Sequence, residues 1–215
     1  GFYLGSQGQI DLSLLFFTIV GTLLCSTGSS VMNNVIESET DKLMERTKNR
    51  VLPTQKISLL SAKIIGFTFI ISGLSILNFK VNSTTCILSL ITIISYLFLY
   101  TPLKRKSWLN TSIGAIPGAL PPLGGWTAAT GSLEWGGIAV FLILFFWQHP
   151  HFYSIAYLYK DDYKNAGLQM LPVIDGGIKR TVLHIFLHAL ILIPISTLPF
   201  FFGISGRVYF VGAYI

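Results

Sequence analysis

The chain has 215 residues, of which 52% are hydrophobic and only 11% are charged. Soluble globular domains carry about 25% charged residues, so this composition excludes an ordinary soluble fold and indicates an integral membrane protein in a lipid bilayer. The net charge of +6 does not indicate nucleic-acid binding, because the basic residues lie in short loops between apolar runs. Cys25 and Cys86 lie in apolar segments and provide neither a disulfide framework nor metal-site spacing.

Six apolar stretches are each long enough to cross a bilayer as a helix, and a partial seventh begins at residue 208. The predicted fold class is therefore all-α, a polytopic transmembrane helical bundle that fills residues 1–215 as a single domain. The chain opens in the tail of an apolar helix and stops inside another apolar run, so we expect this domain to be truncated at both ends. The six stretches cover residues 12–32, 57–79, 84–103, 109–130, 136–157 and 181–203.

The stretch 109–130 differs from the others because it is rich in proline and glycine, with Pro117, Pro121 and Pro122 inside it. We expect a broken or kinked helix here. Irregular backbone at membrane depth is tolerated only inside protein or along a cavity, so the segment is a candidate pocket wall. Simple packing roles for its prolines and glycines are the alternative.

The charges predict the orientation of the chain in the membrane. Alternate loops share one side, and the loops 33–56, 104–108 and 158–180 hold 12 of the 15 lysines and arginines. The positive-inside rule makes this side cytoplasmic in a bacterial inner membrane, or the matrix side of a mitochondrial inner membrane. Seven of the nine acidic residues lie on the same side, which the rule does not require, so we expect this face to be the active one.

A row of oxygen-bearing side chains follows the first apolar stretch. Asn33, Glu37 and Asp41 are four residues apart, so on a helix they share one face, and Glu45 continues the row. Mg²⁺ is commonly held by a few carboxylates together with substrate phosphates. The pattern therefore predicts a metal–diphosphate site, although an ordinary charged loop between two helices has the same composition. Cations that would bind the same phosphates follow at Arg46, Lys48 and Arg50.

A second basic segment follows Tyr100 at the end of the third apolar stretch. One interpretation is a topology anchor, in which an interfacial tyrosine precedes basic residues. The other is a further set of phosphate-binding cations that faces the acidic row and includes Lys104 and Arg105.

Histidines and carboxylates near the end of the fifth stretch form a third group. Polar residues at membrane depth are costly, and function is their default explanation. His149 and His151 are two residues apart and lie on opposite sides of a helix, so they cannot both bind one metal ion. We expect one of them to contact a cofactor while the other packs. Asp161 and Asp162 offer a second carboxylate cluster, which suits a diphosphate carried on two or more Mg²⁺ ions.

These segments together resemble a known family. Asn33-xxx-Glu37-xxx-Asp41 resembles the first motif of the UbiA-type membrane prenyltransferases, and the following MERTKNR resembles the protohaem IX farnesyltransferase branch of that family. The resemblance covers essentially the whole chain, with its motifs in the same order. Its further segments are YTPLKR from Tyr100, NTSIGAIPGALPP from Asn110, WQHPHF from Trp147 and KDDYKNAG from Lys160.

The resemblance implies a fold of nine membrane helices, about seven of them represented here, and transfer of a farnesyl group from farnesyl diphosphate to a vinyl group of protohaem IX, giving haem O. It implies Mg²⁺ as cofactor, at the oxygen ligands Asn33, Glu37, Asp41, Asp161 and Asp162. It implies Arg46, Lys48, Arg50, Lys104 and Arg105 as diphosphate-binding residues. For contact with haem or with an allylic cation it indicates His149, His151, Tyr100 and Tyr153.

Two positions depart from the wider superfamily. Glu37 stands where aspartate is more general, and no aspartate follows Asp161 or Asp162 four residues later. The second departure leaves the ligands of a second metal ion open. Another aromatic acceptor, a quinone precursor or a chlorophyll-like ring, is the nearest alternative, and a membrane transporter is a more distant one. Haem-pathway or oxidase-assembly proteins are the expected protein partners.

Overall fold

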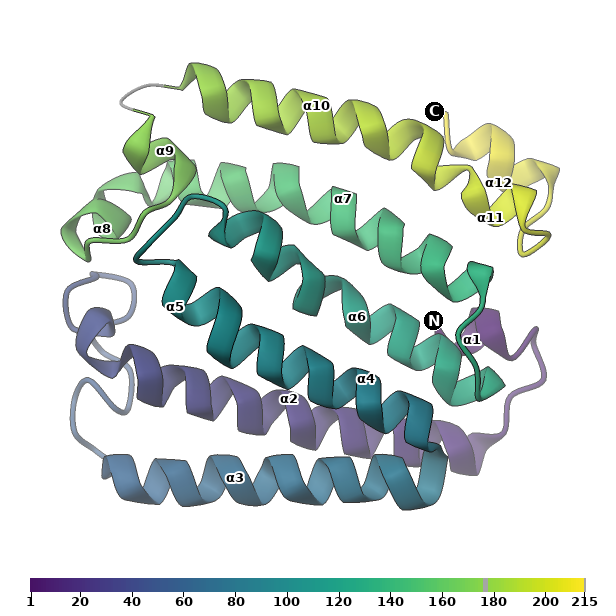
Figure 1. Ribbon diagram of the computed structural model, residues 1–215, viewed down its shortest axis with the longest axis horizontal. Helices are drawn as coiled ribbons and strands as arrows, with labels where there is room; N and C mark the ends of the chain where they lie inside the picture. The colour runs from purple at the N-terminus through teal and green to yellow at the C-terminus, as the bar shows by residue number, and fades with distance from the viewer. Residues whose placement is uncertain (176–177, 215) are drawn as a thin grey trace.

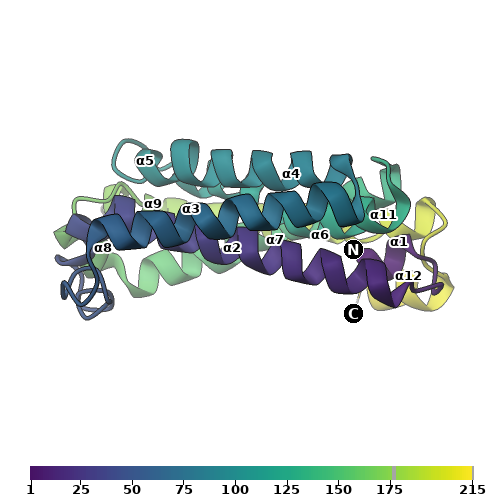
Figure 2. The same cartoon turned by 90° about the horizontal axis from the view of Figure 1, so that it is seen from below.

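The computed structural model describes residues 1–175 and 178–214, and every regular element in these ranges is a helix. Figure 1 shows the long helices side by side along the longest axis, and Figure 2 shows the same bundle from below. The all-α class is thus confirmed. Ile215, where the predicted single domain ends, lies outside the described residues.

The first half of the chain forms two long antiparallel helices and then a third. The short α1 (Phe2–Gly5) is followed by α2 (Leu12–Asp41), which begins where the Asp11 carboxylate accepts the backbone N–H groups of Ser13 and Leu14. Side chains of Ser58 and Asn82 cap the next two helices in the same way. These are α3 (Leu59–Ile76) with the π-helical extension η1 (Leu77–Val81), then α4 (Ser83–Ile94), the π-helical η2 (Ser95–Tyr100) and α5 (Thr101–Leu103).

The second half begins with α6 (Asn110–Thr130), the proline-rich segment. The sequence predicts a broken or kinked helix here, and a break is wrong, because α6 is continuous over 21 residues with all three prolines inside it. A kink within the continuous helix stays a prediction. Proline removes one hydrogen bond and crowds the preceding turn. Packing of α6 against both α4 and α7 outweighs this local preference. The remaining helices are α7 (Trp135–Leu158), α8 (Lys160–Asn165), α9 (Leu171–Ile174), α10 (Lys179–Ser196), α11 (Leu198–Phe201) and α12 (Arg207–Gly212).

Within residues 1–175 and 178–214, five helical segments are long and apolar enough to cross a membrane, which makes this a multi-pass membrane protein. The helix α6 has the length to span but not the apolar composition, and it lies between α4 and α7 within the bundle. The segments are Leu12–Asp41, Leu59–Val81, Ser83–Leu103, Trp135–Leu158 and Lys179–Phe201.

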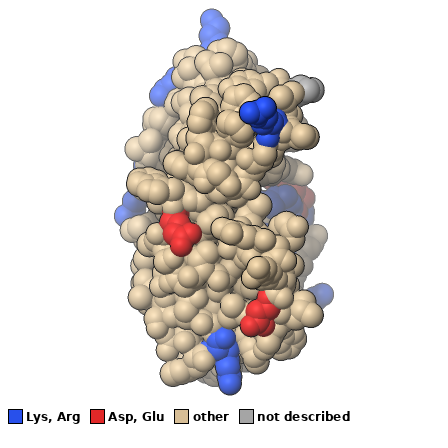
Figure 3. All heavy atoms as spheres, turned by 90° about the vertical axis from the view of Figure 1, so that its right-hand side faces the viewer, with Lys and Arg blue, Asp and Glu red and all other residues tan. Residues whose placement is uncertain are grey.

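The loops with most of the charge gather at one end of the bundle, on the left of Figure 1. These are the loop between α2 and α3, the loop between α5 and α6, and the segment around α8 and α9. The opposite end, which faces the viewer in Figure 3, carries only scattered charges. The fold thus brings the charged motifs of the sequence together at one end of the helices.

Helices α2 and α3 approach closely because both carry glycine where they meet. A Cβ on Gly28 would lie 2.7 Å from the carbonyl oxygen of Gly66, and one on Gly73 would lie 2.7 Å from the backbone nitrogen of Cys25. Helices in lipid associate largely through such close packing, since lipid is as apolar as their side chains. The glycines therefore position α2, the helix that carries Asn33, Glu37 and Asp41.

The substitution Gly73→Ala should destabilise the bundle by about 1–3 kcal/mol, because the added methyl group overpacks the contact with Cys25. The measurement is the unfolding midpoint of the purified protein in detergent. The control is Gly212→Ala in α12, where an added Cβ meets no heavy atom within 4 Å. Equal midpoints for the two variants would contradict this account of the helix pair.

Candidate active site

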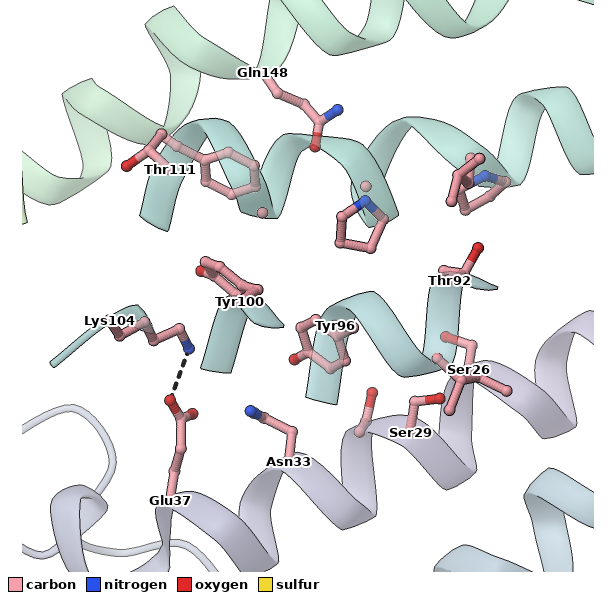
Figure 4. A pocket seen from close by; sticks show the side chains of 18 of the residues that line it. Ser26, Ser29, Asn33, Glu37, Thr92, Tyr96, Tyr100, Lys104, Thr111 and Gln148 are labelled. Carbon is pink, nitrogen blue, oxygen red and sulfur yellow. Dashed lines mark hydrogen bonds and ion pairs between the residues drawn. The ribbon is translucent and has the colours of Figure 1, made fainter. Parts of the chain in front are cut away.

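A cavity of about 810 Å³ lies between α2, the α4–η2 segment, α6 and α7. This is within the usual range for a small-molecule site. Its charged end is lined by residues of α2 and the neighbouring loops, and Figure 4 shows several of them from close by. From there it extends between the helices toward Thr22 on α2, Thr85 on α4 and Gly124 on α6. The cavity therefore has a charged head and a long neutral body.

Asn33, Glu37 and Asp41 all line the charged head, as their four-residue spacing predicted. They occupy the last turns of α2, which ends at Asp41. The expectation that Glu45 continues this row is wrong. Glu45 follows the end of the helix, is exposed, and pairs with Lys48 rather than facing the cavity.

Asp41 is the most deeply buried of the three, with 1% of its surface exposed. Its Oδ2 atom accepts a hydrogen bond from Arg50 Nη1 at 2.9 Å, and Arg50 also donates to the Asn34 side chain. The Thr47 hydroxyl donates to the Asp41 backbone carbonyl at 2.9 Å, which folds the loop back over the helix end. The other carboxylate oxygen, Oδ1, is buried and has no hydrogen-bond partner among the described residues. A buried carboxylate oxygen that lacks a donor is suited to accept a cation.

Glu37 forms an ion pair with Lys104, with 2.8 Å between Oε1 and Nζ, and both side chains are only about 15% exposed (Figure 4). The Lys104 ammonium also lies 4.5 Å from the centre of the Tyr100 ring. Burial alone would lower the pKa of this ammonium, but Tyr100 and Glu37 outweigh burial and raise its pKa above the ordinary value. Lys104 therefore remains positively charged at neutral pH.

Asn33 is held by the irregular segment at the end of the third span. Its Nδ2 atom donates to the Thr101 hydroxyl at 3.0 Å, and that hydroxyl donates to the Tyr96 carbonyl at 2.8 Å. This arrangement leaves the Asn33 side-chain oxygen available to the cavity. The π-helical turn η2 brings Tyr96 and Tyr100 to the cavity wall, with their rings stacked at 5.8 Å. Such turns occur frequently at functional sites.

The structure separates the five predicted diphosphate-binding cations into two groups. Arg46, Arg50 and Lys104 line the cavity. Arg46 also lies over the Tyr159 ring, 5.4 Å from its centre. Lys48 and Arg105 do not line it: Lys48 pairs with Glu45, and Arg105 donates to the Thr40 hydroxyl.

The second carboxylate cluster lies beside the site rather than in its wall. The Asp162 carboxylate accepts the backbone N–H groups of Glu45 and Arg46, both at 3.4 Å, and so anchors the loop that carries Arg46. Asp161 is exposed. Within the described ranges, no three His, Cys, Asp or Glu side chains lie close enough together to hold a metal ion. Any cation at this site would therefore take oxygens from Asn33 or from a substrate as well.

His149 and His151 lie on opposite sides of α7, as their spacing predicted. His149 is buried and forms hydrogen bonds with the Phe145 carbonyl and the Ser112 hydroxyl. Its ring stacks on the His188 ring, with 4.0 Å between the ring centres. His151 is exposed and stacks on Trp147. Neither histidine lines the cavity, and neither does Tyr153, which is buried behind the wall. Of the four residues predicted to contact haem or an allylic cation, Tyr100 is the one on the wall.

Several wall residues were not singled out from the sequence. Gln148 projects from α7 onto α6, where its Nε2 donates to the Ala115 carbonyl at 3.3 Å. On α2, hydroxyl side chains precede Asn33 at intervals of three or four residues and lie on the same helix face. This spacing could have identified them as wall residues from the sequence, since polar residues recur on one face of an otherwise apolar span. These hydroxyl residues are Thr22, Ser26, Ser29 and Ser30.

Known proteins of similar sequence are prenyltransferases. The model of the UbiA prenyltransferase family matches residues 1–215. A protoheme IX farnesyltransferase of Solibacter usitatus is 45% identical over 205 residues, which is 95% of this chain and 70% of that protein. One of Koribacter versatilis is 46% identical over 199 residues, which is 93% of this chain and 64% of that protein. The chain thus spans about two thirds of the length of these relatives.

Solved structures of similar fold include UbiA homologues. A structure of digeranylgeranylglyceryl phosphate synthase matches with a TM-score of 0.82 at 19% identity, over 99% of this chain and 74% of that one. A UbiA homologue from Archaeoglobus fulgidus, bound to DMAPP and Mg²⁺, matches with a TM-score of 0.72 at 18% identity, over 95% and 74% of the two chains. At these identities the likeness concerns the fold.

The family match over the whole chain agrees with a helical bundle around a cavity that has a charged head. The chain belongs to the UbiA prenyltransferase family, and within it to the branch of the protoheme IX farnesyltransferases.

Proposed function

We propose that this protein transfers a farnesyl group from farnesyl diphosphate to a vinyl group of protohaem IX, giving haem O for the haem A cofactor of cytochrome oxidases. The observation that carries the proposal is the charged head of the cavity. There the buried Asp41, with one unpartnered oxygen, lies beside Glu37 and Asn33 and opposite Arg46, Arg50 and Lys104. The curated relatives supply the name of the acceptor, protoheme IX.

The oxygens of the head fit Mg²⁺. The unpartnered Asp41 Oδ1, the Glu37 carboxylate and the Asn33 side-chain oxygen are hard ligands on one helix face, and Mg²⁺ prefers oxygen ligands shared with substrate phosphates. Mg²⁺ bound there would neutralise charge on the leaving diphosphate. The related A. fulgidus structure holds both DMAPP and Mg²⁺. Asp161 and Asp162 lie beside the cavity and not in its wall, so their role as ligands of a second Mg²⁺ ion stays a prediction.

The cations that line the head would bind the diphosphate oxygens. Arg46 and Arg50 offer planar groups that match phosphate oxygens in pairs, and Lys104 offers a compact charge held in place by Glu37. Lys48 and Arg105 do not line the cavity and remain predicted diphosphate-binding residues. The farnesyl chain would extend from this head into the body of the cavity.

The reaction itself asks for little covalent chemistry from the protein. The bond between C1 of the farnesyl group and its diphosphate oxygen breaks, and the electron pair leaves with the diphosphate. The vinyl group of protohaem IX forms a new carbon–carbon bond to C1, water adds to the carbon left positive, and one proton is released. The stacked rings of Tyr96 and Tyr100 beside the head would stabilise the allylic cation through their faces. His149, His151 and Tyr153 remain predicted haem contacts.

We place the reaction at the charged end of the bundle. This end would be cytoplasmic in a bacterial inner membrane, or would face the matrix in a mitochondrion, because it carries most of the lysines and arginines. Haem-pathway or oxidase-assembly proteins would act as partners there.

Incubation of membranes containing the protein with protohaem IX, farnesyl diphosphate and Mg²⁺ should yield haem heavier by one farnesyl group and one water. Mass spectrometry of the extracted haem measures this product. Omission of Mg²⁺ should abolish it, because the leaving diphosphate then lacks its counter-charge. Unchanged haem together with prenylation of a quinone precursor or a chlorophyll-like ring would reject protohaem as the acceptor, and no diphosphate release with any acceptor would return the transporter as the better explanation.

The isosteric change Asp41→Asn should lower kcat/KM by about 100-fold and raise the Mg²⁺ concentration needed for half-maximal rate, because a metal-facing charge is lost. The matched control is Glu39→Gln. Glu39 is also on α2, but it is exposed, pairs with Lys42 and does not line the cavity, so this variant should behave like the parent. An Asp41→Asn protein with parental rate and Mg²⁺ dependence would remove the metal site from the proposal.

A further inference from the structure

Gly124 on α6 is an exception among the glycines of the cavity wall. A Cβ on Gly114 would lie 2.5 Å from the Tyr100 ring, and one on Gly118 would lie 2.0 Å from Gln148 Oε1. Those two glycines are explained by the side chains packed on them. A Cβ on Gly124 would meet no heavy atom within 4 Å. The missing side chain of Gly124 therefore leaves open space in the body of the cavity.

This space lies at the end of the cavity farthest from the charged head. One turn beyond Gly124, Thr127 is fully buried, and its hydroxyl is 2.9 Å from that of Thr85. Asn82 Nδ2 donates to the Thr127 carbonyl at 2.9 Å. The wall around this end is uncharged: Leu88 of α4 and Leu120 of α6 line it and pack together with Leu123, and Thr22 and Thr85 add hydroxyl groups. Hydrogen-bonded side chains thus close the bundle just past Gly124.

The distance from the head to this end is long enough to hold three isoprene units. Asn33 and Thr101 are hydrogen-bonded at the head, and 13 residues of helix separate Thr101 from Leu88, or about 20 Å at 1.5 Å per residue. An extended chain advances about 1.2 Å per bond, so the twelve bonds from the diphosphate oxygen to the last carbon of the farnesyl backbone span about 14 Å. Each further isoprene unit adds about 5 Å on the same scale. By these figures the third unit of a farnesyl group ends about 6 Å, or roughly one helical turn, short of Leu88, and a large side chain at position 124 would fill that gap.

We propose that Gly124 determines donor chain length, because its missing side chain admits the third isoprene unit of the donor. Side chains on a helix tilt toward its N-terminus, and the N-terminus of α6 is at the charged head. A large side chain at position 124 would therefore lean toward the incoming chain and shorten the cavity. This inference rests on one part of the proposed function, namely that the donor is a prenyl diphosphate. It does not depend on which acceptor is prenylated.

The test compares binding of geranyl and farnesyl S-thiolodiphosphates, which do not react, by calorimetry on the protein in detergent with Mg²⁺. Gly124→Leu should raise Kd for the farnesyl analogue at least about tenfold, the scale on which an apolar pocket discriminates by size. The Kd for the geranyl analogue should change much less, because two units end before the added side chain. The control is Gly212→Leu, the same change at a helical glycine whose Cβ also meets open space, outside this cavity. It should leave both values as in the parent.

A second variant protects the test against misfolding. Ser89→Leu fills the cavity from α4, where Ser89 lines the wall beside Leu88, and should produce the same selective loss of the farnesyl analogue. Parental farnesyl binding in both filled variants, equal loss of both analogues, or no binding of either analogue by the parent would overturn the proposal.

Turnover with protohaem IX separates this inference from the proposed function. Selective binding in the variants without haem farnesylation by the parent would reject the acceptor and keep the role of Gly124. Haem farnesylation by the parent with unchanged selectivity in the variants would reject the role of Gly124 alone.

Discussion

The ion pair between Glu37 and Lys104 is the interaction on which the rest of the site depends. It joins α2 to the end of the third span at a position where both side chains are about 15% exposed. Removal of one partner of a buried pair typically costs about 3–5 kcal/mol, because the other charge is left uncompensated. The pair therefore fixes how α2 meets η2, and with it the place of Asn33 and of the two stacked tyrosines.

The charged groups of the head are only partly paired with one another, which suits the head to an anionic ligand with a bound metal ion. Glu37 and Asp41 each have a cationic partner, yet among the described residues Asp41 keeps a buried oxygen without a donor, and the Arg46 side chain faces the cavity without a salt bridge to a carboxylate. A diphosphate with its metal ion would supply both missing partners. Buried polar atoms without partners are rare in folded proteins, so Asp41 is better explained by a ligand than by stability of the fold.

Shape in the body of the cavity comes from glycine and proline as much as from large side chains. Gly114 and Gly118 allow Tyr100 and Gln148 to pack against α6, while Pro117 and Pro121 form part of the wall. Gly28 and Gly73 play a different role and bring α2 and α3 into close contact. Glycines thus allow close helix packing on the side of α2 that faces α3, and they shape the cavity on the side that faces α6.

The sequence by itself determined the membrane class, five of the six expected spans and the shared face of Asn33, Glu37 and Asp41, because composition and helical period are local properties. Only the tertiary structure decided the continuity of α6 through its prolines, the turn of Glu45 away from the row, and the position of His149 behind the wall. These features depend on contacts between helices far apart in the chain. Periodicity cannot report such contacts, because it says which residues share a face but not which helix lies opposite.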